Sequence, residues 1–169
     1  IFRSLGKEPN PRLETLKQAV KEADTEIWVP PVVYHELSDT SEADAPANPY
    51  LDTAIAEGWL RVAIPLAGDR GESFDRSANS VVKARTIADD FLNARSKYPE
   101  TNNWRDAAIV ALAVRLFEEN ERIRVITHTA DENLAKACAR IPPEFGYYEI
   151  ESRYYNPPRT VKSEFPTAD

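Results

Sequence analysis

The stretch IWVPPVVYHEL, from Ile27 to Leu37, contains the pattern that decides the fold. An apolar run meets two prolines, and the second, Pro31, suits the first position of a helix because its missing N–H is not needed there. We therefore predict a buried strand that ends before Pro31 and a helix that begins at it. Helical spacing puts Glu36 on or beside the face that carries Val32 and Val33. A carboxylate on a core-facing surface requires a cation or another partner, because burying a lone charge is costly.

A second stretch, RVITHTADENL from Arg124 to Leu134, repeats the arrangement. An apolar strand is followed by a short turn and by an acidic residue at the start of the next helix. Strands and helices alternate along the whole chain, which favours a parallel sheet with helices on both faces. The predicted fold class is therefore α/β, a three-layer α/β/α sandwich around a central parallel sheet. In such sheets, ligands bind at the carboxyl ends of the strands.

Periodicity and turn residues set the expected elements. Strands are predicted over residues 26–30, 59–66, 122–127 and 146–153. Helices are predicted from residue 11, from residue 31, over residues 50–58 with Gly58 closing the helix, through the apolar stripe of residues 81–92, over residues 106–119 and after residue 129. A polar loop is expected over residues 40–49. One domain then covers residues 1–153, and an irregular tail with three prolines covers residues 154–169.

Composition narrows the class of protein. The chain has 169 residues, of which 42% are hydrophobic, and this suits one globular domain with a sizeable core. A net charge of −7 argues against a broad basic surface for nucleic acid, although an acidic metal site can itself be the contact of a nuclease. No apolar run approaches the roughly 20 residues that span a bilayer. The lone Cys138 is expected to be a packed thiol, which fits a reducing, cytoplasmic setting.

Three acidic residues stand out by position. Glu36 lies in the helix after the first strand, Asp106 precedes the apolar run AAIVALAVRL, and Asp131 follows the strand RVIT. Each has an ordinary interpretation: Glu36 as a solvent-facing residue, and Asp106 and Asp131 as helix N-caps. Taken together, all three occur just after a strand or at the opening of a helix, and a parallel sheet gathers such positions along one edge. Carboxylates crowded there repel one another unless a cation neutralises them.

The ligand chemistry points to a hard cation. Oxygen ligands without cysteine, and with at most one histidine, suit Mg²⁺ or Mn²⁺. Such an ion can lower the pKa of a bound water and orient it for attack on a phosphate. The sequence has no glycine-rich phosphate loop among its five glycines, no Gly-x-Ser-x-Gly nucleophile elbow and no cysteine pair for zinc.

The segments PPVVYHEL, RDAAIVALAV and VITHTADENL resemble, in order, the three internal signatures of the PIN-domain ribonucleases. The match runs from about Ile1 to Ile150. The resemblance implies an α/β/α sandwich, cleavage of single-stranded RNA and dependence on Mg²⁺ or Mn²⁺. It implies that Glu36, Asp106 and Asp131 are catalytic residues, which hold the metal or position the attacking water.

The third signature, Thr-x-Asp, aligns in two ways. Thr129 has the direct spacing to Asp131, whereas Thr127 would fit with an insertion, and we prefer Thr129. In the family, the first acidic residue ends a strand just ahead of a segment like IFRSLG. The resemblance therefore implies one of two alternatives: this strand and its aspartate lie upstream of Ile1, or the chain lacks part of the site.

The toxin branch of the family, of VapC type, implies a small antitoxin partner and a homodimer. Arg3, Arg105 and His128 lie next to the expected acidic edge and are candidates for contact with RNA phosphates, with solvated surface charge as their ordinary interpretation. The predicted function is a metal-dependent endoribonuclease. The alternative is a catalytically degenerate PIN fold that binds RNA or a protein without cutting.

Overall fold

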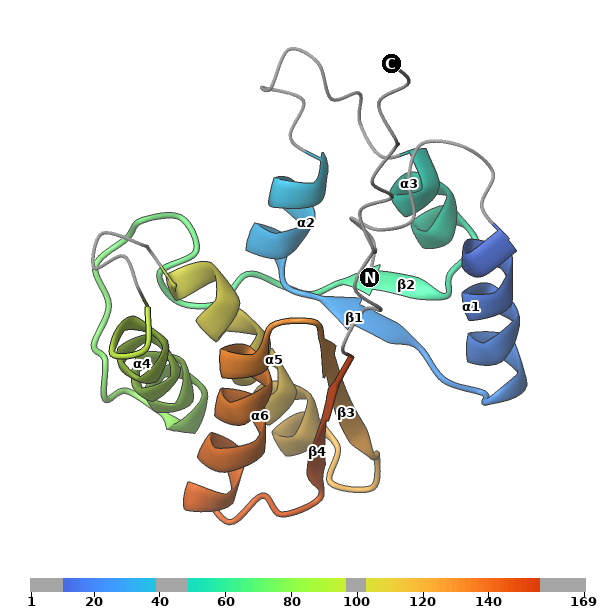
Figure 1. Cartoon of the computed structure of the whole chain (residues 1–169). Helices are drawn as coiled ribbons and strands as arrows, with labels where there is room; N and C mark the ends of the chain where they lie inside the picture. Colours follow the sequence, from blue (N-terminus) through green and yellow to red (C-terminus); the bar gives the residue numbers. More distant parts are fainter. Residues whose placement is uncertain (1–10, 39–48, 97–102, 156–169) are drawn as a thin grey trace, which may run out of the picture.

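The computed structural model describes residues 11–38, 49–96 and 103–155, and these contain six helices and four strands (Figure 1). The elements in chain order are α1 (Pro11–Glu22), β1 (Ile27–Val29), α2 (Pro31–Ser38), α3 (Pro49–Ala56), β2 (Leu60–Val62), α4 (Ser80–Asn93), α5 (Trp104–Glu119), β3 (Val125–Thr129), α6 (Glu132–Glu144) and β4 (Ile150–Tyr154). The predicted alternation of strands and helices, and with it the α/β class, is confirmed. Predictions for the loop over residues 40–48 and for the tail beyond Tyr155 lie outside the described residues.

The strand predicted over residues 59–66 was too long, because β2 ends at Val62. The Ala63 N–H still donates to the Val29 carbonyl of β1 at 2.9 Å, but beyond Ala63 the backbone bonds to side chains instead. The Ile64 carbonyl accepts a hydrogen bond from Arg115 at 2.8 Å, and the Leu66 N–H donates to the Asp69 carboxylate at 2.7 Å. The chain after Val62 is therefore a loop anchored by side chains.

The strand predicted over residues 122–127 lies further along the chain, over Val125–Thr129. Asn120 causes this shift, because it holds the residues just before β3 in a turn. Its side chain accepts a hydrogen bond from the Arg122 N–H and its carbonyl accepts one from the Ile123 N–H, both at 3.1 Å. The last strand, predicted over residues 146–153, begins later, because β4 spans Ile150–Tyr154.

Both strand pairs are parallel, as predicted. Within the described residues, however, the strands form two separate two-stranded sheets, β1 with β2 and β3 with β4. Figure 1 shows β1 and β2 together with α1 and α3 in one part of the molecule, and β3 and β4 together with α6 in another. We call these two parts units. The carboxyl ends of the four strands therefore lie in two units and, within the described part of the chain, do not share one sheet.

Two main clusters of apolar side chains correspond to these units. One joins α4, α5 and α6 to β3 and β4, and the other joins α1 and α3 to β1 and β2. A small third cluster connects them, in which Leu66 packs with Ala108 and Ala111 of α5 and with Val32 of α2. Helix α5 thus contacts both units, and its many alanines allow close approach on several sides. Across the described ranges, no helix is long and apolar enough to cross a membrane.

Candidate functional site

Asp131 lies at the carboxyl end of β3 and is fixed on both sides. Its Oδ1 accepts a hydrogen bond from the Leu134 N–H at 2.8 Å, which makes it the N-cap of α6. Its own N–H donates to Thr129 Oγ1 at 3.0 Å. The predicted N-cap is confirmed, and the residue that contacts Asp131 is Thr129 rather than the buried Thr127. Because the cap uses one carboxylate oxygen, the exposed side chain has a second oxygen for a cation.

Asp106 is not the N-cap that the sequence predicts. Helix α5 begins two residues earlier, at Trp104, after Asn103, whose side chain makes no capping bond. Asp106 therefore lies in the first turn, where the positive end of the helix dipole stabilises a negative charge. Its half-buried carboxylate also acts on α6: burial raises the pKa of the Cys138 thiol to about 11, and the charge of Asp106 adds to that rise. Asp106 thus lies within electrostatic range of α6.

Glu36 lies in the second half of α2, and its side chain is exposed. Val32, one turn earlier, packs against Leu66 and α5, so the apolar face of α2 is turned towards α5 while Glu36 reaches solvent at its border. Glu36 thus lies beside the core-facing surface of α2 and not on it, which is one of the two placements that the sequence predicts. A glutamate side chain is long enough to act from such a border position, so its role stays a prediction.

The residues proposed as RNA contacts have different surroundings. Arg105 is exposed in the first turn of α5, and Arg3 lies outside the described residues. His128 is the register partner of Arg153 across β3 and β4. Partial burial lowers the pKa of His128, and the positive charge of Arg153 lowers it further. Both effects favour the neutral imidazole, so Arg153 is the stronger positive charge at this position.

The three acidic residues do not form a closed metal cage. Within residues 11–38, 49–96 and 103–155, no three side chains of His, Cys, Asp or Glu approach closely enough to hold a metal together. The donor chemistry nevertheless fits a hard cation, because the candidates offer carboxylate oxygens only. Mg²⁺ usually binds one or two carboxylates and keeps several waters, so a site with fewer than three protein ligands is compatible with this cation.

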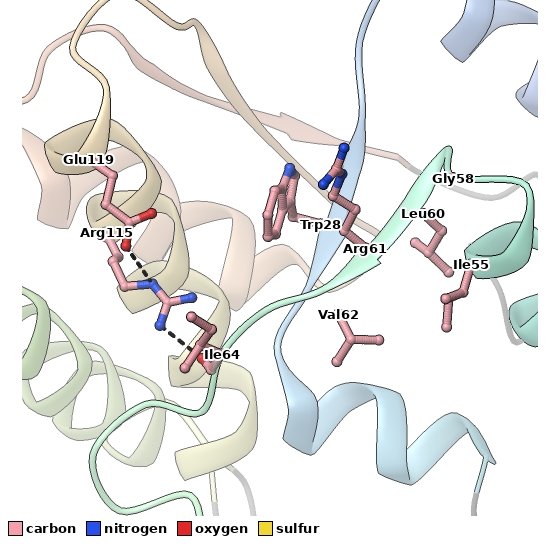
Figure 2. A pocket seen from close by; sticks show the side chains of 9 residues that line it. All are labelled: Trp28, Ile55, Gly58, Leu60, Arg61, Val62, Ile64, Arg115 and Glu119. Atoms are coloured by element: carbon pink, nitrogen blue, oxygen red, sulfur yellow. Dashed lines mark hydrogen bonds and ion pairs between the residues drawn. The ribbon is translucent and has the colours of Figure 1, made fainter.

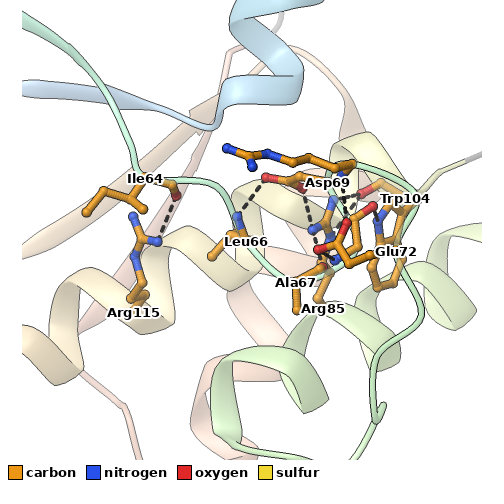
Figure 3. Close-up of polar contacts among 10 residues, drawn as sticks. Ile64, Leu66, Ala67, Asp69, Glu72, Arg85, Trp104 and Arg115 are labelled. Atoms are coloured by element: carbon orange, nitrogen blue, oxygen red, sulfur yellow. Dashed lines mark hydrogen bonds and ion pairs between the residues drawn. The ribbon is translucent and has the colours of Figure 1, made fainter.

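A buried arginine that the sequence analysis missed holds the first turn of α5 in place (Figure 3). Arg85 of α4 is 1% exposed and forms an ion pair of 2.5 Å with Asp69. Its guanidinium donates to the carbonyls of Ala67 at 2.9 Å and Trp104 at 3.2 Å, and it stacks on the Trp104 ring. Arg85 therefore ties the loop after β2 to the turn that carries Asp106. The available signal was its place within the apolar stripe of α4, one turn after Val81.

A shallow pocket of about 530 Å³ opens beside β2 (Figure 2). Trp28, Arg61, Ile64 and Arg115 contribute to its lining, whereas none of the three candidate acidic residues does. Its charges are already compensated, since Arg61 pairs with Glu26 at 2.6 Å and Arg115 with Glu119 at 3.5 Å. The pocket is therefore distinct from the edge that carries Asp131.

Comparison with known proteins gives one match. A family model described as "Halobacterial PIN domain" matches residues 1–162 and so covers nearly the whole chain. No curated protein and no solved structure matches the chain.

Proposed function

Because the chain belongs to the PIN-domain family, we propose that it is a metal-dependent endoribonuclease that hydrolyses phosphodiester bonds in single-stranded RNA. The observation that carries the proposal is the Thr129–Asp131 turn. It holds an acidic side chain at the carboxyl end of a parallel strand, at the start of a helix. Ligands of α/β proteins bind at such edges.

Each of the three acidic residues has a proposed role. Asp131 and Asp106 would hold Mg²⁺ or Mn²⁺, and Glu36 would position the attacking water or complete the ligand set. A bound ion of this kind supplies Lewis-acid chemistry, in that it activates water and stabilises negative charge on a phosphate. Thr129 keeps the Asp131 backbone in its turn, and the Arg85 network keeps the first turn of α5 in place. Arg105 and Arg3 are proposed as phosphate contacts.

The finer fold is also a proposal. We propose that residues 1–153 form one PIN-like domain in which the two short sheets belong to a single central sheet between helical layers. Two features support this: in the described part of the chain, β1 pairs only with β2, and β3 pairs only with β4. β1 and β3 then each have one edge at which a further strand could pair.

The biological setting is proposed from the resemblance alone. A toxin role of VapC type would bring an antitoxin partner and a homodimer. A cytoplasmic location would suit the single cysteine, which is free and buried.

A second candidate function is a PIN domain that binds RNA or a protein without cutting. The exposed position of Glu36 favours it, as does the lack of a three-residue metal group among the described residues. This candidate predicts RNA binding without any metal-dependent cleavage.

Cleavage of a labelled single-stranded RNA with added Mn²⁺ separates the two candidates. We expect the wild-type protein to cleave, EDTA to stop the reaction, and Asp106→Asn, Asp131→Asn and Glu36→Gln each to reduce the rate at least about 100-fold, because each removes a charge from the metal site. Asparagine is itself a good N-cap, so Asp131→Asn should retain the fold.

The matched control is Glu132→Gln. Glu132 directly follows Asp131 in sequence, and its exposed carboxylate pairs with Lys136. It should cleave at the wild-type rate, and thermal melts should agree among all variants. Full activity in Asp106→Asn and Asp131→Asn would remove the nuclease proposal. Metal-independent binding without cleavage would favour the second candidate.

A further inference from the structure

The β3–β4 sheet has a face that points away from α6. Thr127 and Ser152 face α6, since the Ser152 hydroxyl donates to the Ala135 carbonyl and Thr127 is buried beside Cys138. Side chains alternate along a strand, so their neighbours in sequence point the other way. We call the opposite surface the outer face, and it is formed by Ile126, His128, Glu151 and Arg153.

The outer face carries a net positive charge on an acidic protein. Arg124 enters it from the residue before β3 and bonds Glu151 through its Nε at 2.7 Å. Arg153 is 3.7 Å from the same glutamate, and its side chain is 55% exposed. One glutamate thus faces two arginines, in a chain whose overall charge is −7. The charge of Arg153 is the less compensated of the two, because Glu151 is engaged by Arg124.

An aromatic side chain extends the outer face towards the carboxyl end of the sheet. The Tyr155 N–H donates to the Thr129 carbonyl at 2.8 Å, which continues the ladder one residue past β4. Alternation then puts Tyr155 on the same side as Arg153, and its side chain is 51% exposed. The carbonyl that fixes Tyr155 belongs to the residue whose hydroxyl fixes Asp131. The basic and aromatic groups are therefore joined to the candidate metal site through a shared residue, Thr129.

We propose that Arg153, His128 and Tyr155 form a binding site for single-stranded RNA, in which Arg153 bonds a backbone phosphate and Tyr155 stacks on a base. The inference rests on the proposed nuclease function, and it names the path that the substrate strand follows away from Asp131. An arginine beside an exposed aromatic ring is the combination by which single strands are held without sequence preference. A protein partner would use the same side chains, and the experiment below separates the two.

The experiment measures binding of a fluorescein-labelled single-stranded RNA to the full chain by anisotropy, in EDTA and at several KCl concentrations. Arg153→Ala should bind roughly tenfold more weakly and should lower the slope of log affinity against log salt by about 0.7, because one phosphate contact is lost. Tyr155→Ala should weaken binding roughly tenfold with an unchanged slope, and Tyr155→Phe should bind like the wild type, because the ring provides the stacking surface.

Two control variants match these changes at the opposite end of the sheet. Arg122 lies in the turn before β3, and Tyr148 precedes β4 and is 75% exposed. Arg122→Ala and Tyr148→Ala should bind like the wild type, and all variants should melt alike.

Wild-type affinity in both Arg153→Ala and Tyr155→Ala overturns the inference, as does an absence of RNA binding by the wild-type protein, which would leave a protein partner as the occupant. Equal losses in the control variants also overturn it. Because the assay needs no cleavage, the two proposals fail separately. A chain that binds through Arg153 and Tyr155 but never cuts refutes only the nuclease. A chain that cuts while Arg153→Ala and Tyr155→Ala both bind normally refutes only the RNA path.

Discussion

Asp131 shows how one side chain can serve both the fold and the proposed chemistry. Its Oδ1 closes the first turn of α6, and its N–H is held by Thr129. A capping aspartate therefore has a fixed orientation before any ligand arrives, which is the pre-organisation that a metal ligand requires. The ordinary interpretation of this residue as an N-cap and the functional one are compatible. Asp106 lies in the first turn of α5 and Glu36 in the second half of α2, so their assignment rests more heavily on the family.

Gly68 provides a residue-scale test of the loop that follows β2. Its φ of +85° favours glycine, and a Cβ there would lie 2.6 Å from Phe74 Cε1 and 2.8 Å from Trp104 Cζ2. Gly71 has a similar φ of +76° with nothing within 4 Å of its Cβ position. Gly71→Ala should cost about 1 kcal/mol of unfolding free energy from the backbone alone. Gly68→Ala should cost roughly 1–3 kcal/mol more, because the rings must move.

Urea denaturation of both variants measures this difference. Equal losses of stability would show that the packing of Trp104 against the Gly68 turn is looser than described.

At the scale of elements, sequence patterns located most of the helices well. Pro11, Pro31 and the apolar stripe after Ser80 mark the starts that the structure shows, and Gly58 lies at φ +78° after α3. The errors occur where side chains compete with backbone pairing. Such competition through Arg115, Asp69 and Asn120 shortened β2 and shifted β3, and no local propensity reveals it.

The candidate site was predicted less completely than the helices. The position of Asp131 follows from its strand and turn, which are local features. Asp106 was misplaced within its helix because the start of α5 depends on the contacts of Trp104 with Arg85 and Gly68, which are distant in sequence. The exposure of Glu36 depends on which side of α2 meets α5, and the sequence of α2 alone does not set that side.

The Arg85 network gives a prediction at this scale. Arg85→Met leaves the Asp69 charge, which is 3% exposed, without its partner, so we expect a loss of about 3–5 kcal/mol in unfolding free energy. Adding Asp69→Asn should restore part of that loss, because it removes the charge and keeps the acceptor for the Leu66 N–H.

Arg95→Met is the matched control, since Arg95 also covers a ring, that of Phe91, but is exposed two residues after α4 ends. It should change stability by less than about 1 kcal/mol. Denaturation curves of the wild type, the Arg85→Met variant, the double variant and Arg95→Met give the four unfolding free energies. A small effect of Arg85→Met would mean that the position of α5 does not depend on this network.

At the scale of the whole molecule, the described residues form two main apolar clusters, which a small third cluster connects at α5. Asp106 lies on α5 and Asp131 caps α6, two elements of the first cluster, whereas α2 with Glu36 follows β1, a strand of the second. A metal site that uses all three residues must therefore span both units. The relative placement of the units controls how far Glu36 is from the other two. The Arg115 and Arg85 bonds to the loop after β2 hold that placement.

Manganese binding in the absence of RNA tests this account most directly. The electron paramagnetic resonance signal of free Mn²⁺ falls as the ion binds, so titration of the full chain gives an affinity. We predict that the wild-type protein and Glu132→Gln bind alike, and that Asp106→Asn and Asp131→Asn bind roughly tenfold or more weakly while melting at the wild-type temperature. Equal Mn²⁺ affinity in the wild-type protein and both aspartate variants would contradict the shared metal site.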